Sequence, residues 1–193
     1  ASAQPPARLP ERLTFSTHAV GTTFHATGSG LAKVASAHSG MTVVVSPTGG
    51  PPAWAPLMNQ SGQPEIGIIS SADAWQAYTG KIAVKLPPGD PRTKPPYDPN
   101  PNLRSLMMGT SLPGGFLVRA DSPMKRPEDM RGKRLTWGYP AFPANIPIGL
   151  AGLALAGLTI KDVEPVVVPE VVAGVRALME GRVDVAIAAV GMG

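Results

Sequence analysis

The chain has 193 residues, of which 43% are hydrophobic and 16% are charged, a composition typical of a compact globular protein. It contains no cysteine, which excludes a disulfide scaffold, a thiol nucleophile and a thiolate metal site. The formal net charge is +4, but the densest basic stretch, residues 125–134, also holds Glu128 and Asp129 and no aromatic residue. A nucleic-acid groove requires a denser basic surface, so we expect no nucleic-acid partner.

Residues 1–12 are typical of a leader or linker. They begin with a small-x-small triplet, Ala1 to Ala3, and continue rich in proline. Such a triplet resembles the remnant of a secretory cleavage site, so this stretch predicts export. No apolar run in the sequence is long enough to span a membrane as a helix.

After the leader, short apolar runs alternate with helical stretches, the pattern of an α/β protein with mainly parallel strands. The elements expected in the first half are strand 13–16, a helix to about residue 38, strand 41–46, helix 53–60, strand 66–69 and helix 71–78. Seven prolines between residues 87 and 101 then exclude a helix or a central strand, and predict a surface excursion. A further strand at 103–108 and a crossing near 114–119 follow.

The second half repeats the first. Its expected elements are strand 135–137, a helix ending near residue 157, strand 165–168, helix 171–180 and strand 183–188. The run "LTF" at Leu13 returns as "LTW" at Leu135 (135 − 13 = 122), and "VVVSP" returns as "VVVPE" at a similar spacing. The repeat predicts two lobes, residues 13–114 with the excursion at 87–101, and residues 115–193.

Two such lobes predict a cleft, because ligands of open parallel sheets bind beyond the carboxyl ends of the strands, near helix N-termini. Its expected walls are the loops 17–25, 47–54, 70–73 and 138–145, together with residues from Pro169 onward. His18 and His25 lie in the first wall without a nearby carboxylate, a spacing that does not favour a metal site. No nucleophile-elbow or phosphate-loop motif occurs, so we expect binding without catalysis or a cofactor.

Four motifs in order resemble the TAXI family of periplasmic solute-binding proteins, which serve TRAP-type transporters. They are "GTTFHATGSGLAKV", "AWQAYTG", "PEDMRGKRLTWG" and "LMEGRVDVAIAAVGMG", and with the neighbouring elements the resemblance covers Leu13 to Gly193. It implies a two-lobed type II periplasmic-binding-protein fold, each lobe a mainly parallel sheet flanked by helices, which closes on a small solute.

The resemblance, carried onto the expected cleft walls, selects a set of ligand-binding residues. They are Gly21, Thr22, Thr23, Phe24, His25, Thr48, Gly49, Gly50, Trp54, Ser70, Ser71, Tyr139, Ala141 and Phe142. Phe24, His25 and Trp54 are expected on one wall, with Tyr139 and Phe142 on the other, although core packing is the alternative for each aromatic residue.

Two motifs of the family are replaced here, which alters the expected solute. Pro51 to Trp54 replace the usual S-x-E-N, and Ala141 to Ala144 replace G-S-G-T. The lost hydroxyls weaken an amino-acid carboxylate clamp, and the aromatic residues favour a bulkier or more apolar solute.

The expected function is capture of a small organic solute, a carboxylate or amino-acid-like anion, in the periplasm. The partners expected are the membrane permease subunits of a TRAP-type transporter. Two alternatives remain open: the metabolite-sensing effector domain of a LysR-type regulator, and a solute-binding protein of the ABC type.

The two halves also differ in length. The first continues through a helix beginning at Ser71, whereas the counterpart of that position in the second half is residue 192. We therefore expect lobe two to be incomplete, lacking its last helices and its return strand, with an exposed apolar face and impaired hinge closure.

Overall fold

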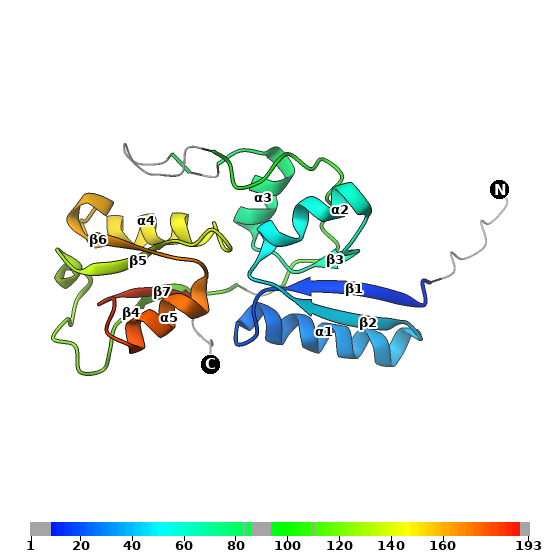
Figure 1. Ribbon diagram of the computed structural model, residues 1–193, viewed down its shortest axis with the longest axis horizontal. Helices are drawn as coiled ribbons and strands as arrows, with labels where there is room; N and C mark the ends of the chain where they lie inside the picture. The colour runs from blue at the N-terminus through cyan, green and yellow to red at the C-terminus, as the bar shows by residue number, and fades with distance from the viewer. Residues whose placement is uncertain (1–8, 83, 86–93, 110, 190–193) are drawn as a thin grey trace.

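A computed structural model describes residues 9–82, 84–85, 94–109 and 111–189 of the chain (Figure 1). The described chain forms two halves side by side, with the elements from β1 to α3 in one and those from β4 to β7 in the other. Residues 1–8 of the expected leader, residues 87–93 of the expected excursion, and residues 83, 86, 110 and 190–193 lie outside the described residues.

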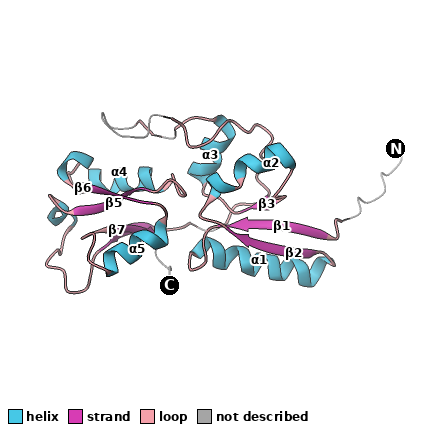
Figure 2. Cartoon of the chain, in the orientation of Figure 1, coloured by secondary structure: helices cyan, strands magenta, loops and turns pink. Residues whose placement is uncertain are grey.

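Lobe one is a three-stranded parallel sheet in the order β2–β1–β3, with helices on both faces (Figure 2). Phe15, at the centre of β1, is buried and lies opposite Val45 and Ile66. In Figure 2, α1 lies on the opposite side of this sheet from α2 and α3. The strands are β1 (Arg12–Thr17), β2 (Thr42–Pro47) and β3 (Ile66–Gly67), and the helices are α1 (Thr23–Ser39), η1 (Pro51–Ala53), α2 (Ala55–Ser61) and α3 (Ser71–Thr79).

Lobe two joins a parallel pair of strands, β5 and β6, to an antiparallel pair, β4 and β7. Leu135 in β5 bridges to Val185, just before β7, and so links the two pairs. The strands are β4 (Gly114–Leu117), β5 (Arg134–Gly138), β6 (Glu164–Val168) and β7 (Ala186–Ala189), and the helices are η2 (Pro127–Met130), α4 (Asn145–Leu155), η3 (Ile160–Asp162) and α5 (Val171–Met179). The core of this lobe is a cluster that includes Leu135, Trp137, Ile146, Leu153 and Ile187.

The apolar helix α4 packs closely on its sheet because glycine recurs on its inner face. A Cβ atom added at Gly149 would lie 2.7 Å from both the Ile187 and the Trp137 side chains. One at Gly152 would lie 2.5 Å from the Phe116 ring in β4. Such distances leave no room for a methyl group, so these glycines set how near α4 approaches the strands.

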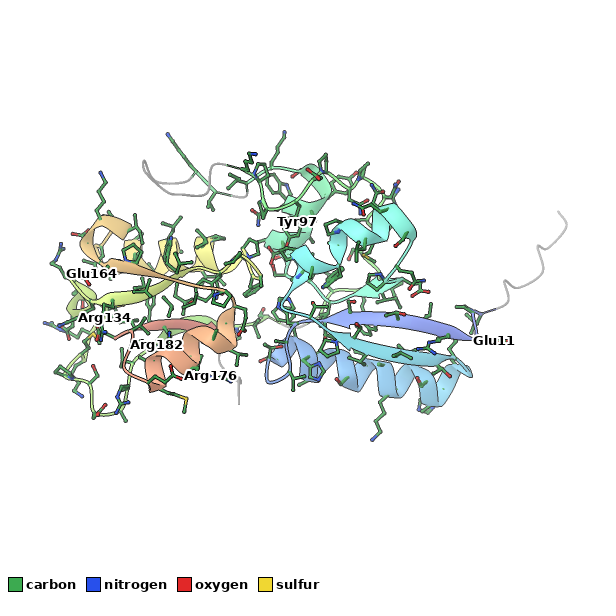
Figure 3. All side chains as sticks on the ribbon, viewed as in Figure 1. Glu11, Tyr97, Arg134, Glu164, Arg176 and Arg182 are labelled. Atoms are coloured by element: carbon green, nitrogen blue, oxygen red, sulfur yellow. The ribbon has the colours of Figure 1, made fainter. Side chains whose placement is uncertain are left out.

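In each lobe an acidic residue ties one parallel strand, β1 or β5, to the segment that precedes a later strand of that lobe. In lobe one the Glu65 carboxylate accepts a hydrogen bond from the Thr14 backbone N–H at 2.8 Å. In lobe two the Asp184 carboxylate accepts the Arg134 backbone N–H at 2.9 Å and also binds its guanidinium. These bonds lower the pKa of both carboxyl groups. Figure 3 shows Arg134 at the outer end of lobe two, far from lobe one.

Some boundaries differ from those expected. Strand 66–69 shortens to the two residues of β3, and residues 103–108 form no strand. Leu106 and Met108 there are each 83% exposed, because no described strand offers them a sheet edge. The crossing expected near 114–119 instead contains β4, which pairs antiparallel with β7.

The space around two helical glycines, Gly149 in α4 and Gly30 in α1, predicts opposite effects of an alanine substitution on stability. Gly149→Ala should lower the free energy of unfolding by about 1–3 kcal/mol, because the new methyl group overlaps Trp137 and Ile187. Gly30→Ala in α1 should raise it by about 0.5–1 kcal/mol, because no atom lies within 4 Å of the added Cβ. Urea denaturation measures both values. Equal shifts in the two variants would contradict this account of α4.

Candidate functional site

The two lobes meet through the loop between β5 and α4, residues 139–144. Tyr139 begins this loop with a φ of 45°, a left-handed conformation that is rare for a bulky residue. Its side chain is fully buried, and its hydroxyl hydrogen-bonds to the Thr136 hydroxyl and reaches the Ile187 carbonyl. This anchor turns the chain, so that the residues that follow extend toward lobe one.

A cluster of three aromatic rings forms the centre of the contact between the lobes. The His18 ring, from lobe one, stacks on Phe24 with a centroid distance of 4.2 Å and an interplanar angle of 14°. Phe142, from lobe two, meets His18 edge-on at 4.9 Å and Phe24 at 5.7 Å. These distances are those of favourable ring pairs, so the cluster holds the lobes together at the cleft.

A small pocket lies beside these rings and draws its lining from both lobes. The lining residues are His18, Thr22, Thr23, Phe24, Leu112, Phe142, Asn145, Val171 and Ala189. Its free volume is about 20 Å³, enough for about one water molecule, because the rings fill most of the space between the lobes. A larger solute therefore requires the lobes to separate before it can enter.

Three helix N-termini lie at this pocket, and each already has a partner. Thr22 caps α1 by accepting the His25 backbone N–H. Glu170 caps α5, accepting the N–H groups of Val172 and Ala173 at 2.6 Å each. Helix α4 follows Ala144, which has no capping side chain, and a carboxylate from lobe one lies beside the Ala144 backbone.

That carboxylate is Asp73, at the start of α3. It is completely buried, and it exchanges hydrogen bonds of 3.0 Å with the Ser70 hydroxyl, the N-cap of its helix. Burial raises the pKa of Asp73 to about 6, against the lowering effect of polar contacts with Ser70, Tyr97 and the Ala144 backbone. Figure 3 shows Tyr97 beside α3, and its burial next to this charge raises the pKa of its phenol.

The other buried titratable group at the cleft is His18, which is 2% exposed. Burial lowers the pKa of His18 from 6.5 to about 4, so the imidazole is neutral at physiological pH. Its Nε2 has no hydrogen-bond partner in the described part of the chain.

Four of the residues selected from the sequence come together in the pocket: Thr22, Thr23, Phe24 and Phe142. Tyr139 does not line it, because its side chain is an anchor in the core of lobe two. Trp54 is also a core residue, packed with Ala55, Ala77 and Tyr97 in lobe one.

The remaining selected residues lie around the pocket without lining it. In the turn Thr48 to Gly50, the Gly50 N–H donates to the Thr48 hydroxyl, and the two glycines abut Ala141 of lobe two. Ser70 caps α3 and Ser71 is exposed. The His25 ring lies 3.0 Å from the Thr17 hydroxyl, and Gly21 is an exposed turn residue with a φ of 91°.

Five lining residues were not selected from the sequence: His18, Leu112, Asn145, Val171 and Ala189. His18, Asn145 and Val171 do lie within the loops expected to form the walls. Leu112 and Ala189 come from the segments around β4 and β7, whose antiparallel pairing carries no signal in the repeat.

His18 and Asp73 predict opposite pH dependences of stability. The pKa of His18 falls from 6.5 to about 4 on folding, so the unfolded chain binds more protons between these pH values and stability decreases as the pH falls through that window. The pKa of Asp73 rises from 3.8 to about 6, so stability rises as the pH falls through that window. Each effect is on the order of 3 kcal/mol at most.

We therefore expect His18→Gln to be more stable at about pH 5 than at about pH 7, because only the Asp73 effect remains. Asp73→Asn should show the reverse, because only the His18 effect remains. Urea denaturation across this range measures both slopes. If both variants keep the slope of the wild type, the two side chains are not buried at the cleft as described.

Solved periplasmic binding proteins share this two-lobed fold. The aliphatic sulphonate-binding protein SsuA of Escherichia coli is 14% identical with a TM-score of 0.52, over 94% of this chain and 52% of that one. SsuA of Xanthomonas axonopodis pv. citri, bound to MOPS, is 17% identical with a TM-score of 0.53, over 93% and 55%. An ancestral arginine-binding protein bound to arginine is 14% identical with a TM-score of 0.55, over 96% and 73%.

These likenesses confirm the two-lobed, periplasmic-binding-protein-like fold expected from the sequence. The chain spans about half the length of the sulfonate-binding proteins it matches. No helix among the described residues is long and apolar enough to cross a bilayer.

No curated protein sequence matches the chain. The sequence profile of the NMT1-like family matches residues 15–193, which is nearly all of it. On that match, the chain belongs to the NMT1-like family.

Proposed function

We propose that this chain forms the solute-binding cleft of an extracytoplasmic binding protein, which captures a small organic solute and delivers it to a membrane transporter. The observation that carries the proposal is the interlobe pocket, where Phe24 and Phe142 meet edge-to-face and buried polar atoms lack partners. Ligand sites typically combine apolar walls with a few placed polar groups, as this lining does, and the lobes separate to admit a solute larger than water. The fold of the sulfonate- and arginine-binding proteins supports the same function.

The transporter we propose is of the TRAP type, on the four motifs that resemble the TAXI family. An ABC-type transporter is the second candidate, because one structural neighbour is titled a putative sulfonate ABC transporter component from Methylobacillus flagellatus. Binding of the solute-loaded protein to each kind of permease in liposomes distinguishes the two. We also propose that the protein works in the periplasm, which fractionation of cells that express the whole gene tests.

A thermal-shift screen tests the proposal directly. It should include carboxylates, amino acids, sulfonates, amides and aromatic acids, because a ligand that binds only the folded state raises the melting temperature by mass action. We expect at least one class to stabilise the protein, and mass spectrometry to recover that compound unchanged after incubation. Consumption of the compound would show an enzyme instead, and no stabilisation by any class would refute solute binding.

The aromatic walls predict which residues carry affinity. Phe24→Ala and Phe142→Ala should each weaken binding of the best compound by about 1–3 kcal/mol, because each removes a ring that faces the pocket. Trp75→Ala, an exposed aromatic residue on α3, is the matched control and should leave affinity unchanged. Isothermal titration calorimetry measures all three. Equal affinities in the three variants would place the solute elsewhere.

A further inference from the structure

Three side chains that line the interlobe pocket hold buried polar atoms without partners. These atoms are the Nε2 of His18, the hydroxyl oxygen of Thr23 and the amide nitrogen of Asn145, and none has a hydrogen-bond partner within the described residues. His18 is 2% exposed and Asn145 is 3% exposed. Buried polar atoms are nearly always bonded, so three of them around one small pocket point to groups that a ligand satisfies.

The pocket offers these polar atoms without any formal charge. None of the described residues that line it is a lysine, arginine, aspartate or glutamate, and the His18 imidazole is neutral because its burial lowers its pKa to about 4. A zwitterionic amino acid would therefore find no carboxylate in the lining for its ammonium group. An anion would find no cation, and burying an unpaired charge is costly.

The helix N-termini do not replace the missing cation. The Glu170 carboxylate already occupies the start of α5, and Asp73 lies at the start of α4. In the turn Thr48 to Gly50, the Gly50 N–H, which could have held an anion, donates to the Thr48 hydroxyl. The buried carboxylate of Asp73 and the half-buried carboxylate of Glu170 repel an incoming anion rather than attract it.

We infer, on the basis of the proposed function, that the cleft takes a small uncharged solute, with one amide-like polar group on an aromatic or branched apolar body. The amide nitrogen of Asn145 donates to the carbonyl oxygen of that group. Thr23 and His18 can each accept from its N–H. Phe24, Phe142, Leu112 and Val171 contact the body. This class differs from the carboxylate or amino-acid-like anion expected from the sequence.

Matched pairs of compounds that differ only in charge test the inference. Benzamide against benzoate, and isobutyramide against isobutyrate, keep the body and exchange the amide for a carboxylate. We expect the amide of each pair that binds to have at least about a 10-fold lower Kd by calorimetry, since a charge without a partner is disfavoured in this pocket.

A variant separates a ligand contact from a structural role. Asn145→Leu removes the unpartnered amide while keeping the volume, so it should weaken amide binding by about 10-fold or more without lowering the melting temperature. Asn102→Leu, on the exposed surface, is the matched control. A loss of melting temperature with unchanged affinity would give Asn145 a purely structural role and overturn the inference.

The remaining outcomes distinguish the inference from the proposed function. If carboxylates, sulfonates or amino acids bind and their amides do not, solute binding stands and the uncharged class is wrong. If no compound of either charge binds, the proposed function fails, and the inference fails with it.

Discussion

The contact between the β5–α4 loop and lobe one is the constraint on which the rest of the structure depends. Three residues of this loop meet three separate segments of lobe one: Ala141 abuts Gly49 and Gly50, Phe142 packs on His18 and Phe24, and the Ala144 backbone faces Asp73. The loop reaches that far because Tyr139 is fixed in lobe two by its buried ring and hydroxyl. The geometry of the cleft thus follows from one anchored turn.

The same contact determines the electrostatics of the cleft. Closing the lobes removes His18 and Asp73 from water, and each responds by favouring its uncharged form. The free-energy costs of burying these two side chains change in opposite directions as the pH changes. The closed arrangement therefore holds both groups with little net effect of pH on stability. A cleft lined by neutral polar groups and aromatic rings is the result, and the proposal that it selects solutes by shape and hydrogen bonding rather than by charge rests on that lining.

The sequence was sufficient to predict those helices and strands whose hydrophobic pattern is local. The strands around Phe15 and Leu135 and the amphipathic helix at Val171 follow from periodicity, and the repeat predicted the two lobes correctly. Residues 103–108 were wrongly expected to form a strand, because an apolar run cannot reveal whether a neighbouring strand exists. The antiparallel pairing of β4 with β7 likewise depends on contacts between distant segments.

The candidate site likewise has features that the local sequence predicts and features that depend on contacts between distant residues. The loops that form the walls could be predicted, since they follow the carboxyl ends of parallel strands. The side chains that enter the pocket could not be predicted. Tyr139 turns into the core of lobe two only by adopting a left-handed backbone, and Trp54 is held over Gly67 by core packing. His18 and Asn145 are candidate ligand contacts because the Nε2 of His18 and the amide nitrogen of Asn145 have no hydrogen-bond partner within the described residues. No sequence pattern predicts such unpartnered atoms.

The most direct test of the account is the distance between the lobes with and without solute. The chain has no cysteine, so spin labels can be attached to single cysteines introduced at Val34 in lobe one and Leu155 in lobe two, which are 59% and 90% exposed. Pulsed electron paramagnetic resonance then measures the distance distribution. The account predicts that a saturating solute converts a broad distribution into a narrow one, because the solute bridges the two walls. A distribution that does not change on saturation would contradict binding between the lobes.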